Sequence, residues 1–203
     1  MRKRLRRNSS SATVVSRGRR APRPAVFLDR DGVLNRSEVR DGKPYAPRRI
    51  EDFRLLPRVA QAVADLKAAG FVIVVVTNQP DVGHGLIDPG TLDAMHDRLR
   101  AAAPVDAIMV CPHRQDEGCS CRKPKPGLIE QAVREFRIAR KASYMVGDRG
   151  SDVVAGRAAG LYTIFLDRGY REQRSEAPDL SVKSLSEAAR CILERHRRGK
   201  GNT

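Results

Sequence analysis

An apolar run at residues 26–28 leads directly into two carboxylates spaced one residue apart, Asp29 and Asp31, and Gly32 follows at once. Such a run is typical of a short, buried, parallel strand. Ligands of open α/β sheets bind just beyond the carboxyl ends of strands. Two acids placed there can hold a hard cation, and one of them can act as a nucleophile or an acid. The alternative is a surface turn whose acids only cap the next element.

Other polar side chains follow further apolar runs or lie in a proline-containing loop, and all are expected at the same edge of the sheet. They are Thr77, Asn78, Lys123, Lys125, Asp148 and Asp152. Together with Asp29 and Asp31 they suit phosphoryl transfer, in which a carboxylate attacks phosphorus while a divalent cation, a lysine and a hydroxyl bind the phosphate oxygens. Each is weak alone, because Thr77 could cap a turn and Asp148 a helix.

Strand and helix patterns alternate along the chain and define how these residues are positioned. Strands are predicted at 26–28, 71–76, 105–110, 143–146 and 162–166, and helices at 56–69, 91–102, 128–136, 151–159 and 185–194. Residues 36–52 and 81–90 are predicted as loops, the first able to fold over a site as a small lid. Repeated βα units indicate a Rossmann-like parallel sheet with helices on both faces. The loop after the first strand leaves no room for a large cap domain.

A second group of residues has the composition of a zinc site. One imidazole and three thiols fall within eleven residues, in a loop punctuated by proline and glycine: Cys111, His113, Cys119 and Cys121. Four protein ligands suit tetrahedral Zn²⁺ and leave no open position, which predicts a structural, zinc-stapled loop. This loop would present Arg122 and Lys123. Unmetallated thiols are the alternative.

Charge and composition divide the chain of 203 residues into three parts. Residues 1–24 carry nine Arg or Lys and no acid, out of a formal net charge of +15, so we expect a disordered basic arm before a domain at 25–194 and a basic tail at 195–203. The arm could touch nucleic acid, although a solubilising tail is the simpler interpretation. No run approaches the roughly 20 apolar residues that span a bilayer. The cysteine usage and the missing secretory signal favour the cytoplasm.

Four ordered motifs resemble those of the haloacid dehalogenase-like phosphohydrolases, over about residues 25–170. They are Leu28-Asp29-Arg30-Asp31-Gly32, Thr77-Asn78-Gln79, Arg122-Lys123-Pro124 and Gly147-Asp148-Arg149-Gly150-Ser151-Asp152. The cysteine-rich loop is similar to the one that marks the branch of the D-glycero-D-manno-heptose 1,7-bisphosphate phosphatases and the histidinol-phosphate phosphatases.

The resemblance implies roles for the acids. Asp29 would be the nucleophile that forms an aspartyl-phosphate, and Asp31 the general acid and base. Mg²⁺ would be held by the Asp29 carboxylate, the Asp31 backbone carbonyl and Asp148, with Asp152 supporting the outer shell. Lys123 would balance charge on the nucleophile and the phosphate. Thr77 and Asn78 would hold the phosphoryl oxygens, and the remaining implied substrate-binding residues are Gln79, Arg122 and Arg149.

The implied activity is that of a Mg²⁺-dependent phosphatase that removes the C7 phosphate of a heptose 1,7-bisphosphate, a small phosphorylated sugar. A gap of only five residues between His113 and Cys119 instead favours a histidinol-phosphate phosphatase, whereas Asp31-Gly32-Val33-Leu34-Asn35 favours the heptose enzymes. A nucleic-acid end-processing or binding protein that uses the basic arm is the more distant alternative. We expect a monomer that does not contact a membrane.

Overall fold

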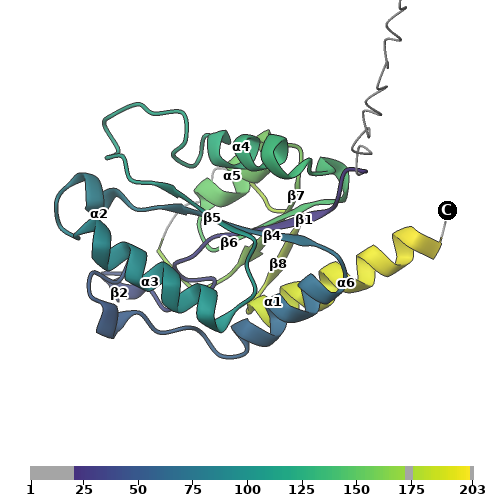
Figure 1. Cartoon of the computed structure of the whole chain (residues 1–203), viewed down its shortest axis with the longest axis horizontal. Coiled ribbons are helices and arrows are strands. Elements are labelled where there is room, and N and C mark those ends of the chain that lie inside the picture. Colours follow the sequence, from purple (N-terminus) through teal and green to yellow (C-terminus); the bar gives the residue numbers. More distant parts are fainter. Residues whose placement is uncertain (1–20, 172–175, 202–203) are drawn as a thin grey trace, which may run out of the picture.

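The computed structural model describes residues 21–171 and 176–201. Six parallel strands form one sheet (Figure 1). Their order across the sheet is β5 (Ala107–Cys111), β4 (Val72–Asn78), β1 (Ala25–Leu28), β6 (Tyr144–Gly147), β7 (Tyr162–Leu166) and β8 (Leu180–Val182). The chain therefore builds outward from β1 in one direction through β4 and β5, and then returns to build outward in the other direction from β6. Ligands of such sheets bind at the carboxyl ends of the strands where the order reverses, which here is beside β1.

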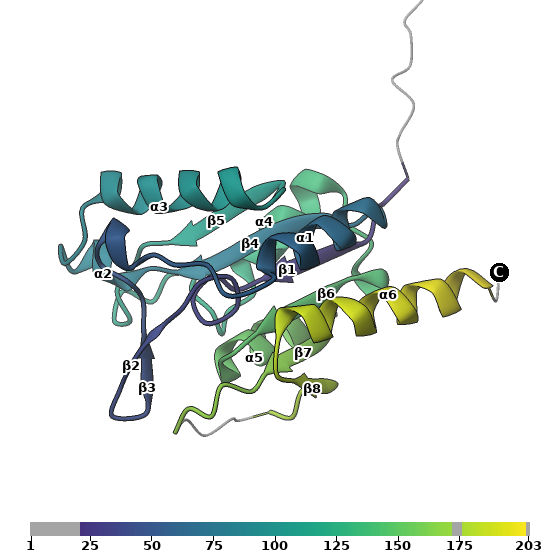
Figure 2. The same ribbon diagram turned by 90° about the horizontal axis from the view of Figure 1, so that it is seen from below.

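Helices cover both faces of the sheet and create two cores. One face carries α1 (Val59–Ala68), α3 (Pro89–Ala102) and α6 (Leu185–Gly201), which Figure 2 shows side by side. The other face carries α4 (Gly127–Phe136) and α5 (Gly150–Ala158). Side chains of β1 alternate between the two cores, Val26 and Leu28 toward one and Phe27 toward the other, as a strand buried on both faces requires. The predicted Rossmann-like sheet is confirmed.

The segment predicted as a polar loop at 36–52 contains more structure than expected. It forms an antiparallel hairpin of β2 (Glu38–Arg40) and β3 (Lys43–Tyr45), followed by a 3₁₀ turn, η1 (Ile50–Asp52). Asp41 and Gly42 join the strands with φ values of 51° and 76°, the positive pair that a tight hairpin turn of the Asp-Gly type needs. Most of the hairpin is exposed, so no buried face produced the alternation that marks a strand.

Three other elements differ from the sequence prediction. The loop predicted at 81–90 begins with a short helix, α2 (Pro80–Gly83), and β8 was not predicted because three residues with an exposed centre carry almost no pattern. Helix α6 runs on to Gly201, across the predicted boundary at 194. The predicted disordered arm lies largely at residues 1–20, outside the described residues. No helix in the described ranges is long and apolar enough to cross a membrane.

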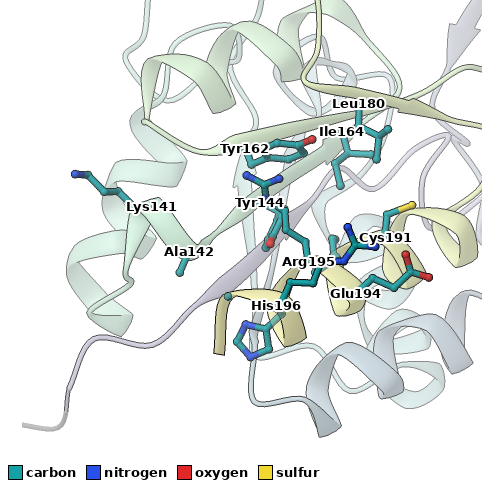
Figure 3. Close-up of a pocket in the computed structure, with 13 residues that line it drawn as sticks. Lys141, Ala142, Tyr144, Tyr162, Ile164, Leu180, Cys191, Glu194, Arg195 and His196 are labelled. Carbon is teal, nitrogen blue, oxygen red and sulfur yellow. The ribbon is translucent and has the colours of Figure 1, made fainter. Parts of the chain in front are cut away.

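A cavity of about 690 Å³ lies at the amino end of the sheet, between α6 and the first residues of β6 and β7 (Figure 3). The guanidinium of Arg195 stacks on the Tyr162 ring at 4.3 Å, and the His196 ring packs on Phe71 at 4.7 Å. These contacts hold α6 against the neighbouring residues just beyond the predicted boundary at 194. None of the predicted site residues lines this cavity.

Candidate active site

The carboxylate of Asp29 lies at the carboxyl end of β1, where the Asp29 backbone N–H donates to the carbonyl of Val146 at 2.9 Å. Its side chain is buried, and its Oδ1 accepts a hydrogen bond from Lys123 Nζ at 2.8 Å. The same ammonium donates to the Val76 carbonyl at 2.8 Å and forms an ion pair with Asp152 at 2.6 Å. Burial raises the pKa of Asp29 to about 7, and the charge of Lys123 opposes that rise.

Asp148, which follows β6, is buried with little compensation. Both of its carboxylate oxygens are inaccessible to solvent, and the hydroxyl of Tyr170 is a hydrogen-bonding partner beside them. Burial, together with the charges of Asp29 and Asp152, raises the pKa of Asp148 well above its usual range. Gly32, with φ at 82°, allows the chain after β1 to pass close to this carboxylate, because a Cβ there would lie 1.7 Å from Asp148 Oδ2.

Asp29, Asp148 and Asp152 form what we call the carboxylate cluster, in which one oxygen from each side chain lies within 4.8 Å of the other two. When all three acids are ionised they carry a charge of −3, and the buried ammonium of Lys123 contributes only +1. A site with a residual charge of −2 and buried carboxylate oxygens as ligands fits Mg²⁺. Asp152 already accepts from the Arg149 backbone N–H at 3.0 Å besides pairing with Lys123, as expected of a supporting residue.

Asp31 occupies a different environment from Asp29, although one residue separates them. Its carboxylate contacts the guanidinium of Arg30 with four N–O distances of 3.0–3.3 Å. It also accepts from Asn35 Nδ2 at 2.9 Å and from Gln79 Nε2 at 2.7 Å. Sequence reasoning assigned no role to Arg30 or Asn35, although their place within and just after the acid motif was a signal for one.

The residues after β4 are close to the carboxylates, but their side chains have specific partners. Thr77 is buried, and its Oγ1 accepts from Gln79 Nε2 at 2.8 Å. The Asn78 side chain brackets the backbone of Lys123, donating to its carbonyl at 3.0 Å and accepting from its N–H at 3.1 Å. Asn78 therefore positions the lysine loop, a contact that was not anticipated beside its implied role in binding phosphoryl oxygens.

A cavity of about 520 Å³ opens over the carboxylates. Its lining includes Asp29, Asp31 and Asp148 at its floor, together with the residues of β3. Three cations, Lys43, Arg122 and Arg149, which we call the cationic rim, also line it and are exposed or half-buried. A fourth cation, Arg48, is paired with Asp81 at 2.7 Å. The cavity therefore combines an anionic floor with a positive mouth, which suits an anionic substrate.

The predicted zinc ligands come together in the loop between β5 and α4. Cys111 Sγ lies 3.2 Å from Cys121 Sγ and 3.6 Å from Cys119 Sγ, and His113 Nδ1 lies 3.2 Å from Cys121 Sγ. All four ligand atoms fall within 4.8 Å, and the sulfurs are too far apart for disulfides. Tetrahedral Zn²⁺ places its ligand atoms about 3.6–3.8 Å apart, so the cluster fits zinc. Arg122 and Lys123 follow the last ligand directly.

Comparison with known proteins gives a consistent result. A model of the HAD-hydrolase-like family matches residues 120–188. The D-glycero-β-D-manno-heptose-1,7-bisphosphate 7-phosphatase of Pseudomonas aeruginosa is 35% identical over 85% of this chain and 99% of the relative. The enzyme of the same name from Pseudomonas putida is 36% identical over 74% and 86%.

Comparison with solved structures agrees with the comparison of sequences. A crystal structure of the D,D-heptose 1,7-bisphosphate phosphatase from B. bronchiseptica, complexed with magnesium and phosphate, superimposes with a TM-score of 0.74 at 31% identity. The match covers 85% of this chain and 99% of that one. The chain therefore belongs to the haloacid dehalogenase-like phosphatases and is a phosphoric monoester hydrolase.

Proposed function

We propose that this enzyme removes the C7 phosphate of a D-glycero-D-manno-heptose 1,7-bisphosphate, with Asp29 as nucleophile. The observation that carries the proposal is the cavity over β1, in which a buried carboxylate paired with Lys123 lies below the cationic rim. Such a cavity can take one phosphate at its floor and a second at its mouth. The relatives named above act on the β form of this sugar phosphate according to their names, so we propose the β anomer.

In the first step, an oxygen of Asp29 attacks phosphorus and the bond between phosphorus and the C7 oxygen breaks. The leaving oxygen takes the electron pair and receives a proton from Asp31. In the second step, water loses a proton to Asp31 and attacks the aspartyl-phosphate, which releases inorganic phosphate and regenerates Asp29. Lys123 keeps the Asp29 oxygen in place and offsets negative charge throughout.

Asp29, the backbone carbonyl of Asp31 and Asp148 would hold Mg²⁺. When bound, the cation neutralises the phosphate oxygens and stabilises the ionised form of Asp29. Thr77 and Gln79 lie beside these groups and are proposed to border the bound phosphoryl group.

The charge of the cavity mouth favours a bisphosphate over histidinol phosphate. The cationic rim attracts the second phosphate of the heptose substrate, and we assign Arg122 and Arg149 to it. Histidinol phosphate instead carries an ammonium group at that end, which the same cations repel. The short gap between His113 and Cys119 is the one feature that favours histidinol phosphate.

A substrate panel tests the proposal directly. We expect kcat/KM for the β-heptose bisphosphate to exceed the values for its α anomer, the heptose 1-phosphate and histidinol phosphate by at least about tenfold. Arg122→Gln should raise KM for the bisphosphate more than for a monophosphate, with Arg134→Gln on α4 as a control of equal charge far from the cavity. A preference of histidinol phosphate over the bisphosphate would refute the substrate assignment.

We further propose that the enzyme acts as a cytoplasmic monomer and that residues 1–20 are dispensable for it. The four cysteines of the chain form no disulfide in the structure, as a reducing compartment favours. Deleting residues 1–20 should leave turnover unchanged. Salt-sensitive binding of DNA that disappears with this deletion would instead support the nucleic-acid alternative.

A further inference from the structure

Arg30 is the largest fully buried side chain among the described residues, although it lies between two active-site acids. A buried guanidinium is costly unless its charge and donors are satisfied. The Asp31 carboxylate satisfies Nε and Nη2, and the ring of Phe53 lies against the guanidinium at 5.6 Å. The remaining terminal nitrogen, Nη1, lies 3.2 Å from Nε2 of His96 on α3.

The contact with Arg30 fixes the state of His96. Arginine has donors only, so His96 Nε2 must accept, and the ring must be neutral with its proton on Nδ1. Burial and the neighbouring guanidinium lower the pKa of His96 to about 4, in agreement with this assignment. A chain of defined hydrogen bonds therefore runs from α3 through His96 and Arg30 to the carboxylate of Asp31.

This chain of hydrogen bonds ends at the Asp31 carboxyl group, which is the part of the residue that takes part in the proposed reaction. The Asp31 side chain is 15% exposed and faces the cavity, while Arg30 approaches it from behind. A general acid must lie within hydrogen-bonding distance of the leaving oxygen, and a misplacement of about 1 Å can cost roughly 100-fold in rate. Asp31 lies in the turn after β1, and side-chain contacts from Arg30, Asn35 and Gln79 determine where its carboxylate lies.

We propose that Arg30 and His96 are positioning residues that hold the Asp31 carboxyl group where, in its protonated form, it can donate a proton to the leaving oxygen. The inference rests on the proposed function, in which Asp31 is the general acid. Neither residue touches the substrate. The aromatic contact with Phe53 and the neutral ring of His96 allow Arg30 to remain buried while its charge is directed to one carboxylate.

A comparison of two substrates with different leaving groups distinguishes a positioning role from a purely structural one. The sugar alkoxide needs a proton to leave, whereas 4-nitrophenolate leaves without one. Because kcat/KM reports the steps up to the first phosphoryl transfer, a defect in the general acid lowers it for the sugar phosphate and spares it for 4-nitrophenyl phosphate. A variant that only loosens the fold lowers both values together.

His96→Leu removes the acceptor for Arg30, and His96→Gln can restore it through Oε1. We expect His96→Leu to lower kcat/KM for the sugar phosphate about tenfold, as loss of one hydrogen bond to a charged group predicts, with less than about a twofold change for 4-nitrophenyl phosphate. His96→Gln should recover most of the loss. Arg30→Lys, which keeps the charge but not the paired contact, should show the same selectivity.

Two further variants make the outcomes unambiguous. Leu99→Ala, from the same buried face of α3, should lower the melting temperature without selectivity between the two substrates. Asp31→Asn should show the selective loss most strongly, at about 100-fold or more. If Asp31→Asn is selective but the His96 and Arg30 variants are not, the positioning role is refuted. If Asp31→Asn lowers both values equally, the acid assignment of the proposed function fails instead.

Discussion

Replacing Asp148 by Asn should stabilise the metal-free protein while abolishing its response to magnesium. The substitution keeps the shape of the side chain and removes one of three buried negative charges that face a single ammonium. Both Asp148 oxygens are buried, burial and the charges of Asp29 and Asp152 raise the pKa of Asp148, and a buried charge that is only partly compensated costs about 1–3 kcal/mol. Removing the charge should recover about 2 kcal/mol, which is roughly 4–8 °C in melting temperature for a domain of this size.

Magnesium should reverse the order of the melting temperatures of the wild type and the Asp148→Asn variant. A ligand present at about 100 times its Kd stabilises the folded state by about 2.7 kcal/mol. The wild-type protein gains this amount, whereas the variant lacks a carboxylate ligand and gains little. Thermal unfolding should therefore rank Asp148→Asn above the wild type in magnesium-free buffer and below it at saturating magnesium. Magnesium is best removed by dialysis without a chelator, so that the zinc loop stays intact.

Asp152→Asn is the matched control, since it removes the same charge from the same cluster. Asp152 is engaged by Lys123 and by the Arg149 N–H, so its replacement breaks contacts and should destabilise the protein under both conditions. The reasoning would be refuted if Asp148→Asn melted below the wild type without magnesium, because the cluster would then not be under electrostatic strain.

Three further predictions concern other parts of the molecule. Asp29→Asn should abolish phosphate release and leave the circular dichroism spectrum unchanged; residual turnover would contradict its role as nucleophile. Cys119→Ser should lose bound zinc, measured by elemental analysis, and lower activity through the disordered loop; a full zinc content would contradict the ligand assignment. The folded state holds His96 neutral with a pKa of about 4, against 6.5 unfolded, so it binds fewer protons than the unfolded state between these values. Its contribution to stability should thus fall by up to about 3 kcal/mol as pH drops through this range, and His96→Gln should remove that slope in denaturant titrations.

The sheet and its site were predictable because their signals are local. The apolar runs of β1, β4 and β6 end in polar residues, and parallel strands bring their carboxyl ends to one edge. That logic correctly brought Asp29, Lys123 and Asp148 together in space. The cluster of one histidine and three cysteines was predictable for a similar reason, since the four residues fall within eleven residues of one another.

The partners of these residues were not predictable, because they depend on contacts between distant segments. His96 is an isolated histidine in an amphipathic helix, and only the packing of α3 on the sheet places it against Arg30. Asn78 is separated from Lys123 by 45 residues, and the zinc-stapled loop must fold back before the two can meet. The hairpin after β1 has a turn signal but no buried face, so pattern alone underestimated it.

Asp29 and Asp31, which have one residue between them, differ in how their negative charges are balanced. Asp31 receives its positive partner from the chain itself, because the residue before it directs a guanidinium behind the carboxylate and His96 holds that guanidinium there. Asp29 shares one ammonium with two other buried acids, which leaves a deficit of two positive charges on its side only. A divalent cation is therefore drawn to the carboxylate of Asp29 and not to that of Asp31. Moving Arg30 out of its buried position would remove the cationic partner of Asp31, and both carboxylates would then lack a full counter-charge within the chain.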